Sequence, residues 1–322
     1  MRTRTKVWLI VAASLVLIGC ILFVGVMSIL KWDFTKLFTG KYENNDYKIH
    51  EDYQNISIIT DTADIVFVPC ENTTTSVSCY EQKNNMHSVS VKDGTLEIEI
   101  VDTRKWYEYI GINFGTPKIT VCIPEGEYGK LSVKASTGNV EIPEVFKFRS
   151  IDISLSTGEV KNYASALEGI KIKTTTGNIC IEDASAGSLD LIVSTGKVTV
   201  SSVTCEGDIA VGVSTGKTYL SNIRCKSVIS SGSTGDILLN NVIATERFSI
   251  DRSTGDVKFD GSDAAEIFVE TDTGDVSGNL LTDKVFITKT DTGDVDVPKT
   301  VTGGRCEITT DTGDIEIKTR RE

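Results

Sequence analysis

The sequence is poor in proline, histidine and basic residues. Among 322 residues there are 5 prolines and 2 histidines, and 33 Lys and Arg stand against 45 Asp and Glu, giving a net charge of −12 at pH 7. The scarcity of proline leaves long strands uninterrupted. The acidic balance argues against nucleic acid as a partner, because phosphate binding needs a basic patch. With His50 and His87 alone and no Cys-x-x-Cys, neither a zinc site nor any cofactor is expected.

Eight cysteines give only weak evidence for disulfides, because their spacings form no regular framework. We predict one candidate bridge, between Cys70 and Cys79, if the chain folds outside the cytoplasm. Cys205 and Cys225 lie one repeat apart in the sequence. We expect them to stack as buried thiols.

Charge is also missing from Val7 to Leu30, a run that follows Arg2, Arg4 and Lys6. At about 1.5 Å per residue, a helix of this length spans the hydrocarbon core of a bilayer. We therefore predict a cytoplasmic basic tip and transmembrane anchor over residues 1–31, followed by a linker over residues 32–45. The basic N-terminus stays inside, so the protein is a single-pass protein of the cell membrane with an extracytoplasmic body.

Two alternatives to an uncleaved anchor stay open. Leu17–Cys20 resembles a lipobox, although a lipobox cysteine is normally followed by polar residues and here further apolar residues follow. A cleaved signal peptide has a shorter apolar core and a small-residue cleavage site, and no such site is clear in this run.

A short phrase recurs ten times: Ser, Thr or Asp, then Thr-Gly, usually with an apolar residue two places on. The spacing is always 19 or 20 residues, and the glycines are Gly138, Gly158, Gly177, Gly196, Gly216, Gly235, Gly255, Gly274, Gly293 and Gly313. Apolar residues also recur five and seven places before the glycine, alternating with polar ones, which is typical of strands. A fixed short period over most of a chain indicates stacked repeats.

We therefore predict an all-β fold, a parallel β-solenoid (β-helix) of about ten coils over residues 131–322. Each coil is expected to hold a strand ending three residues before the glycine, a Thr-Gly corner, a second strand and a variable connection. A one-residue change in spacing must fall in the connection, since a slip within a strand would turn its apolar face outward. The alternative is an antiparallel meander with Thr-Gly hairpins, but primed hairpin turns favour Asn-Gly or Asp-Gly.

Residues 46–130 are less regular, and we predict that they form a first coil and a cap. The first coil is expected over Ile56–Val68, and the insertion after it carries a hairpin turn at Lys92–Thr95. The same insertion holds an aromatic stretch that could lie under the cap: Trp106, Tyr107, Tyr109 and Phe114. At the other end of the chain we expect charged residues to blunt the last strand: Lys318, Arg320, Arg321 and Glu322.

Acidic corners are the one feature with possible chemistry. Three Asp-Thr-Gly tripeptides match the aspartic protease motif, but no pair of lobes brings two of them together. Aspartates also follow the glycine in five consecutive repeats, and carboxylates are ligands that calcium favours. The calcium candidates are Asp275, Asp294 and Asp314. The alternative is a solvated acidic edge, and we assign no catalytic, cofactor or metal residues.

The corners at Ser136–Asn139, Ser233–Asp236, Ser253–Asp256 and Asp272–Asp275 resemble the repeat of a bacterial β-strand-repeat family called putative adhesins, whose function is unknown. The stretches Lys31–Lys36 and Thr103–Tyr107 are similar as well, so the likeness covers nearly the whole chain. The resemblance implies a β-repeat body on the outer face of the membrane and supplies no catalytic residues.

We therefore expect a non-catalytic interaction or structural module at the cell envelope, with the lipid bilayer and an unknown cell-surface or membrane protein as partners. The alternatives are an accessory or sensory partner of an envelope-stress system and a carbohydrate-active enzyme.

Overall fold

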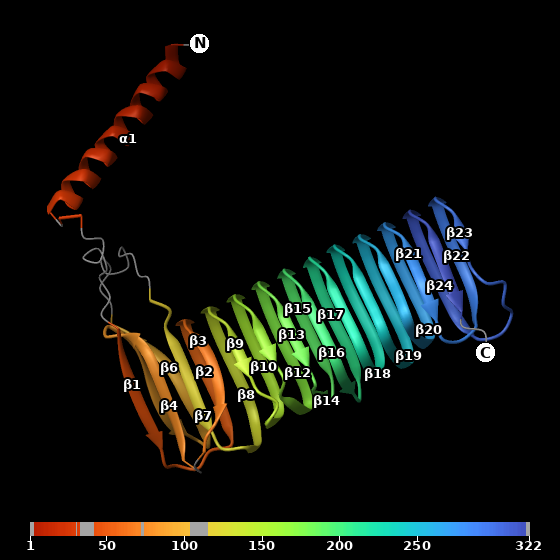
Figure 1. Cartoon of the computed structure of the whole chain (residues 1–322), viewed down its shortest axis with the longest axis horizontal. Helices are drawn as coiled ribbons and strands as arrows, with labels where there is room; N and C mark the ends of the chain where they lie inside the picture. The colour runs from red at the N-terminus through yellow and green to blue at the C-terminus, as the bar shows by residue number, and fades with distance from the viewer. Residues whose placement is uncertain (1–2, 30, 33–41, 72–73, 104–114, 320–322) are drawn as a thin grey trace.

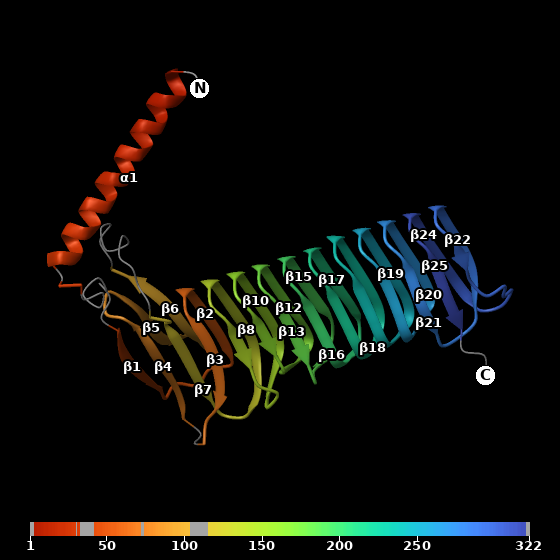
Figure 2. The same ribbon diagram turned by 45° about the horizontal axis from the view of Figure 1, so that its top comes forward.

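The protein is described from a computed structural model, which covers residues 3–29, 31–32, 42–71, 74–103 and 115–319. The helix α1 (Thr3–Ile29) lies beyond one end of a long stack of strands (Figures 1 and 2). Its segment Lys6–Ile29 is long and apolar enough to cross a membrane, with a mean hydropathy of 2.9. The aromatic stretch at residues 106–114 and the charged residues 320–322 lie outside the described ranges.

Seven strands form the end of the stack next to the helix: β1 (Tyr42–Ile49), β2 (Asn55–Thr62), β3 (Asp64–Pro69), β4 (Thr75–Gln82), β5 (Asn85–Lys92), β6 (Thr95–Asp102) and β7 (Lys118–Ile123). The predicted hairpin is present, because β5 and β6 pair antiparallel. Its turn residues Asp93 and Gly94 both have positive φ, as a primed turn requires.

The remaining strands build the regular stack: β8 (Gly126–Thr137), β9 (Val140–Ile142), β10 (Phe146–Thr157), β11 (Val160–Asn162), β12 (Ser165–Thr176), β13 (Ile179–Glu182), β14 (Ser185–Ala186), β15 (Leu189–Thr195), β16 (Val198–Cys205), β17 (Asp208–Thr215), β18 (Thr218–Thr234), β19 (Ile237–Thr254), β20 (Val257–Thr273), β21 (Val276–Leu280), β22 (Lys284–Thr292), β23 (Val295–Asp296), β24 (Gly304–Thr312) and β25 (Ile315–Thr319). They pair in parallel, with corner threonines opposite one another, as Thr157 is opposite both Thr137 and Thr176. The predicted parallel β-solenoid of about ten turns is confirmed.

Corner glycines allow the coils to approach closely. Gly216 has φ of +140°, and a Cβ added there would lie 1.8 Å from the carbonyl oxygen of Gly196 in the coil below. Glycine is required at this position for two reasons: it adopts this φ without strain, and it has no Cβ to meet the neighbouring coil. The strand before the corner runs to the threonine, two residues further than predicted.

The connection between coils is itself a third β face, where the sequence predicted a variable loop. A second corner lies six residues after the glycine and has left-handed φ, for example 52° at Asn222 and 51° at Asn241. Asn tolerates this conformation better than most residues. Beyond it, β12 pairs with β14 through Ala166 and Ala186, and β14 pairs with β16. Cys205 and Cys225 are buried on this face, in adjacent coils, as predicted.

Register shifts lie at the second corner, as between Asp260 and Ser262, or where the third face meets the next long strand, as between Phe148 and Ser150 of β10. The one-residue change in repeat length is therefore absorbed outside the inward-facing ladders, as predicted. These ladders form the core, in which Val160, Ile170 and Ile172 are almost fully buried.

A buried cation interrupts this apolar interior. Arg252 is 1% exposed and donates from Nη2 to Ser230 Oγ at 2.7 Å and to Thr218 Oγ1 at 3.4 Å. The two hydroxyl residues occupy ladder positions that are apolar in most other coils. Polar residues stand at these two positions because their hydroxyl groups accept hydrogen bonds from the buried guanidinium.

At the cap, coil order departs from chain order. The coil of β2 and β3 lies between β8 and β9 on one side and β6 and β7 on the other. The chain therefore forms the coil of β2 and β3 first. It then passes through the antiparallel strands β4 and β5 and adds β6 and β7 on the cap side of that coil. From β8 onward it continues the stack on the other side.

The predicted bridge between Cys70 and Cys79 is wrong. Cys70 instead forms a disulfide with Cys122 of β7, and their Cα atoms are 5.2 Å apart. Because β3 and β7 pair in parallel, Cys70 lies beside Cys122, whereas Cys79 points into the interior of the cap. The disulfide fastens the outer layer to the first coil.

The opposite end of the stack is also reordered. Strand β24 lies between β20 and β22, and β25 lies between β21 and β23, so the last coil of the chain is inserted beneath the one before it (Figure 1). The terminal coil is therefore β22–β23, which exposes Val285, Ile287 and Val295. The prediction that Lys318 blunts the terminal strand is wrong, because β25 is paired on both sides.

A buried ion pair spans the inserted coil. Lys284 on β22 lies opposite Gly304 of β24, and its Nζ reaches Asp263 Oδ1 of β20 at 2.6 Å. The side chains are 3% and 9% exposed. Gly304 allows β24 to lie close to β20, since an added Cβ would overlap the carbonyl of Ala265.

Candidate functional site

A groove of about 560 Å³ crosses the third face of five successive coils. It is formed where the short segments of β8, β10, β12, β14 and β16 stack, and it is lined by Glu127, Tyr128, Lys147, Phe148, Arg149, Ser165, Ala166, Leu167, Ser185, Ala186, Gly187, Thr204 and Glu206. The hollow follows from the sequence, because Ala166 and Ala186 replace the larger Phe148 at the same position of the stack.

The floor of the groove is apolar and its rim is charged. Phe148, Ala166 and Ala186 are buried, and at the edge Leu167 is 76% exposed. The rim carries an ion pair between Arg149 Nε and Glu168 Oε1 at 2.7 Å. A concave apolar surface with a polar rim is the usual form of a binding groove.

Aromatic rings close one end of the groove and cover one another. The Tyr128 ring stacks on Tyr53 at 6.2 Å and packs against Phe148 at 5.8 Å between centroids. Its hydroxyl donates to the carbonyl of Pro124. The Tyr128 ring is therefore already engaged by two neighbouring rings. Sequence reasoning missed this groove, because the connection between coils was expected to be a loop.

The calcium candidates lie in one ladder of hydrogen bonds along the corner edge. Asp275 Oδ1 accepts the backbone N–H of Asp314, and Asp314 Oδ1 accepts the N–H of Asp294, both at 2.8 Å. Lower coils repeat the bond, for example from the N–H of Asp275 to Asp256 Oδ1 at 3.0 Å. Each carboxylate thus satisfies a backbone donor of the next coil.

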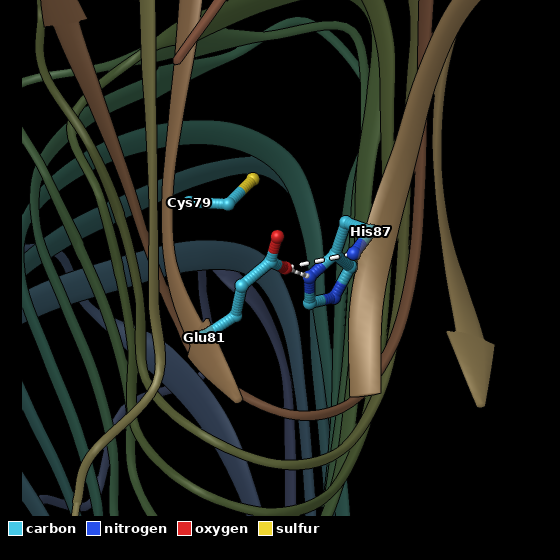
Figure 3. A group of neighbouring side chains, drawn as sticks. All are labelled: Cys79, Glu81 and His87. Atoms are coloured by element: carbon cyan, nitrogen blue, oxygen red, sulfur yellow. Dashed lines mark hydrogen bonds and ion pairs between the residues drawn. The ribbon is translucent and has the colours of Figure 1, made fainter. Parts of the chain in front are cut away.

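A third group of polar side chains lies inside the cap. Figure 3 shows that Cys79 and Glu81 of β4 and His87 of β5 point toward one another. His87 Nδ1 is 2.6 Å from Glu81 Oε2, which also accepts the His87 backbone N–H at 2.7 Å. All three side chains are nearly inaccessible.

Outer partners fix the orientation of this group. The second carboxylate oxygen, Glu81 Oε1, accepts from Asn45 Nδ2 at 2.7 Å, and the other ring nitrogen, His87 Nε2, is 2.8 Å from Thr60 Oγ1. Burial, together with the negative charges of Glu81 and Asp46, raises the pKa of the Cys79 thiol to about 12. The alternation Cys79-x-Glu81 places both side chains on the inward face of one strand. His87 is brought to them by the tight turn between β4 and β5, where Gln82 pairs with Asn85, and no turn was predicted there.

The sequence matches the family model Toastrack DUF4097 over residues 53–213 and 205–322. The chain belongs to the Toastrack family. The match covers the cap from its first coil onward and the whole solenoid, so the family relationship predicted from the corner motifs is confirmed. No curated protein matches the sequence.

Several solved structures resemble this Toastrack chain at low identity. A putative adhesin from Bacteroides fragilis is 18% identical, with a TM-score of 0.43, over 86% of this chain and 97% of its own. A putative adhesin from Parabacteroides distasonis is 11% identical, with a TM-score of 0.49, over 86% and 98%. A putative lipid binding protein from the same organism is 14% identical, with a TM-score of 0.47, over 87% and 98%.

Proposed function

We propose that this Toastrack protein is anchored in the membrane by α1 and acts outside the cytoplasm as a non-catalytic, adhesin-like interaction module at the bacterial cell envelope. The observation that carries the proposal is the groove on the third face, with its buried apolar floor and the exposed Leu167 at its edge. The partner that we propose is an extended polypeptide segment of another membrane or cell-surface protein.

The dimensions of the groove favour such a segment. Five stacked coils about 4.8 Å apart give a length of about 19 Å, which matches about six residues of extended chain. The apolar floor can accept alternate side chains, and the charged rim can pair with polar ones. A sugar ligand would need an exposed aromatic platform, and the Tyr128 ring already packs against Tyr53 and Phe148.

Two observations support placement outside the cytoplasm. The apolar helix follows basic residues, an arrangement that keeps the N-terminus inside. The Cys70–Cys122 disulfide fits an oxidising compartment. Twelve residues lie between Ile29 and Tyr42, so the cap lies no more than about 45 Å along the chain from the anchor. The groove, near the cap end of the stack, can then meet partners close to the membrane.

A catalytic role is not supported by the buried cap. Thr60, His87 and Glu81 form a hydroxyl–imidazole–carboxylate series like that of a hydrolase. However, Thr60 is 5% exposed and Glu81 is 1% exposed, which leaves no room for a substrate at the hydroxyl. An accessory role in envelope-stress sensing would use the same groove and differs only in the identity of the partner.

The test is loss of a specific partner from detergent-solubilised membranes. Leu167→Asp places a charge on the apolar edge of the groove and is expected to abolish co-purification. Val301→Asp is the matched control, because Val301 is 90% exposed and lies between β23 and β24, far along the stack. Equal recovery of the partner by both variants would contradict a binding role for the groove.

Topology is tested separately in intact cells. External protease should remove the body and leave a short N-terminal fragment in the membrane, because only residues up to about 31 are protected. A protected C-terminal tag would contradict the proposed orientation, and a mature N-terminus at or after Cys20 would contradict the uncleaved anchor.

A further inference from the structure

We infer that Cys79, Glu81 and His87 form a binding site for one zinc ion inside the cap. In the part of the chain that the structure describes, they are the one group of three Cys, His or acidic residues whose ligand atoms all lie within 4.8 Å of one another. The set offers one thiolate, one carboxylate oxygen and one imidazole nitrogen, which are the three ligand types of protein zinc sites.

The contact between His87 and Glu81 requires a positive charge or a proton between them. His87 Nδ1 and Glu81 Oε2 are only 2.6 Å apart, and the backbone N–H of His87 already donates to Oε2. When His87 Nε2–H donates to Thr60 Oγ1 at 2.8 Å, the lone pair of Nδ1 faces the carboxylate. A cation between these two atoms would be bound by both the Nδ1 lone pair of His87 and the Oε2 lone pair of Glu81.

The outer contacts are those of a metal centre. Zinc-bound histidines usually donate their second ring N–H to an acceptor, and bound carboxylates are themselves hydrogen-bonded. Here Thr60 is placed to accept from His87, and Asn45 donates to Glu81 at 2.7 Å. Among the described residues the Cys79 sulfur has no hydrogen-bond partner, so its lone pairs are free for a metal. The site therefore has oriented O and N ligands and an uncommitted S ligand.

Charge and geometry favour zinc over calcium. A thiolate and a carboxylate neutralise a divalent cation, and the thiolate is too soft a ligand for calcium. Tetrahedral coordination places neighbouring N and O ligands about 3.3 Å apart, so His87 and Glu81 need to separate by less than about 1 Å. Water fills the fourth position.

A small cleft leads to the site from the surface. It has a volume of about 170 Å³, and His87 lies in its wall beside Tyr42, Asp61, Thr62, Gln82 and Asn85. Asp61 adds a carboxylate at the mouth that attracts cations. A zinc ion would then join β4 to β5 directly, and through Asn45 and Thr60 it would tie both strands to β1 and β2. The ion would hold closed the end of the solenoid next to the anchor.

The experiment uses the full-length protein in detergent, stripped with chelator and reloaded with one equivalent of zinc. After desalting we expect one zinc per chain by elemental analysis, and a saturable rise in melting temperature on the order of 5 °C at a hundredfold excess over Kd. Cobalt in place of zinc should give a sulfur-to-metal charge-transfer band.

Cys79→Ser and Glu81→Gln should each lose the retained zinc, and Cys79→Ser should lose the cobalt band. Cys205→Ser and His50→Gln are matched controls, one a buried thiol and the other an exposed histidine outside the site, and both should keep one zinc. The cobalt charge-transfer band is measured on the unaltered protein. It therefore tests sulfur ligation even if the Cys79→Ser variant fails to fold. Absence of that band, or zinc retained equally by Cys79→Ser, would overturn it.

Discussion

Replacing Gly216 by alanine should destabilise the solenoid far more than the same change elsewhere in its coil. Gly216 has φ of +140°, a region that costs a residue with a side chain about 1–3 kcal/mol. The new Cβ would lie 1.8 Å from Gly196 O, so adjacent coils must separate locally by more than about 1 Å.

That separation weakens two backbone hydrogen bonds at the corner. Gly196 donates to Thr215 O and Val198 donates to Lys217 O across this interface, both at 3.0 Å. Each is worth about 0.5–1.5 kcal/mol net. Reduced entropy of the unfolded chain offsets up to about 1 kcal/mol. The expected loss is therefore about 2–5 kcal/mol, or about 5–15 °C in melting temperature.

Gly212→Ala is the matched control. Gly212 lies on β17 of the same coil, and an added Cβ would meet only Ile192 Cγ1, at 4.0 Å. Its replacement should change stability by less than about 1 kcal/mol and can raise it. The assay is thermal unfolding of the full-length protein followed by circular dichroism. If the two alanine variants melt within 2 °C of each other, the corner does not depend on glycine.

Three further predictions concern the disulfide, the buried arginine and the acidic ladder. Cys70→Ser should cost up to about 4 kcal/mol, since the Cys70–Cys122 bridge has a sequence separation of 52, and non-reducing peptide mapping should never find Cys70 joined to Cys79. Ser230→Ala should destabilise by about 1–3 kcal/mol in the native background but be neutral beside Arg252→Met, because the hydroxyl serves the guanidinium; equal costs in both backgrounds would refute that pairing. Carboxamides can accept the same backbone N–H bonds as the ladder carboxylates. A triple Asn variant should therefore match or slightly exceed native stability at low salt, with no saturable calcium shift, and a calcium shift abolished by the substitutions would establish a site at Asp275, Asp294 and Asp314.

The coil itself could be predicted from the sequence because its constraints are local and repeated. The Thr-Gly corner, the inward apolar positions and the hairpin at Asp93 and Gly94 each follow from a few neighbouring residues. A second signal was also present: Asp, Ser, Asn, Asn and Gly recur six residues after five consecutive corner glycines, and all five have left-handed φ. It indicates the second corner and hence a three-sided coil.

The order of the coils could not be read from the repeat, because equivalent corners stack equally well in any order. At the far end of the stack the choice is made by residues distant in sequence, as Lys284 crosses Gly304 to reach Asp263. At the cap, the position of β7 beside β3 brings Cys122 to Cys70. His87 reaches Glu81 across the tight turn between β4 and β5, which was not predicted, while Asn45 and Thr60 come to the pair from distant strands.

Photo-crosslinking from the groove in intact cells tests most directly whether this protein is an envelope interaction module. A photoreactive residue replaces Leu167 at the groove edge in one strain. In another strain it replaces Ile192, which is exposed on β15 of the neighbouring coil and does not line the groove. We expect position 167 alone to give a discrete adduct with a membrane or cell-surface protein. The same adducts from both positions, or none from position 167, would contradict the proposal.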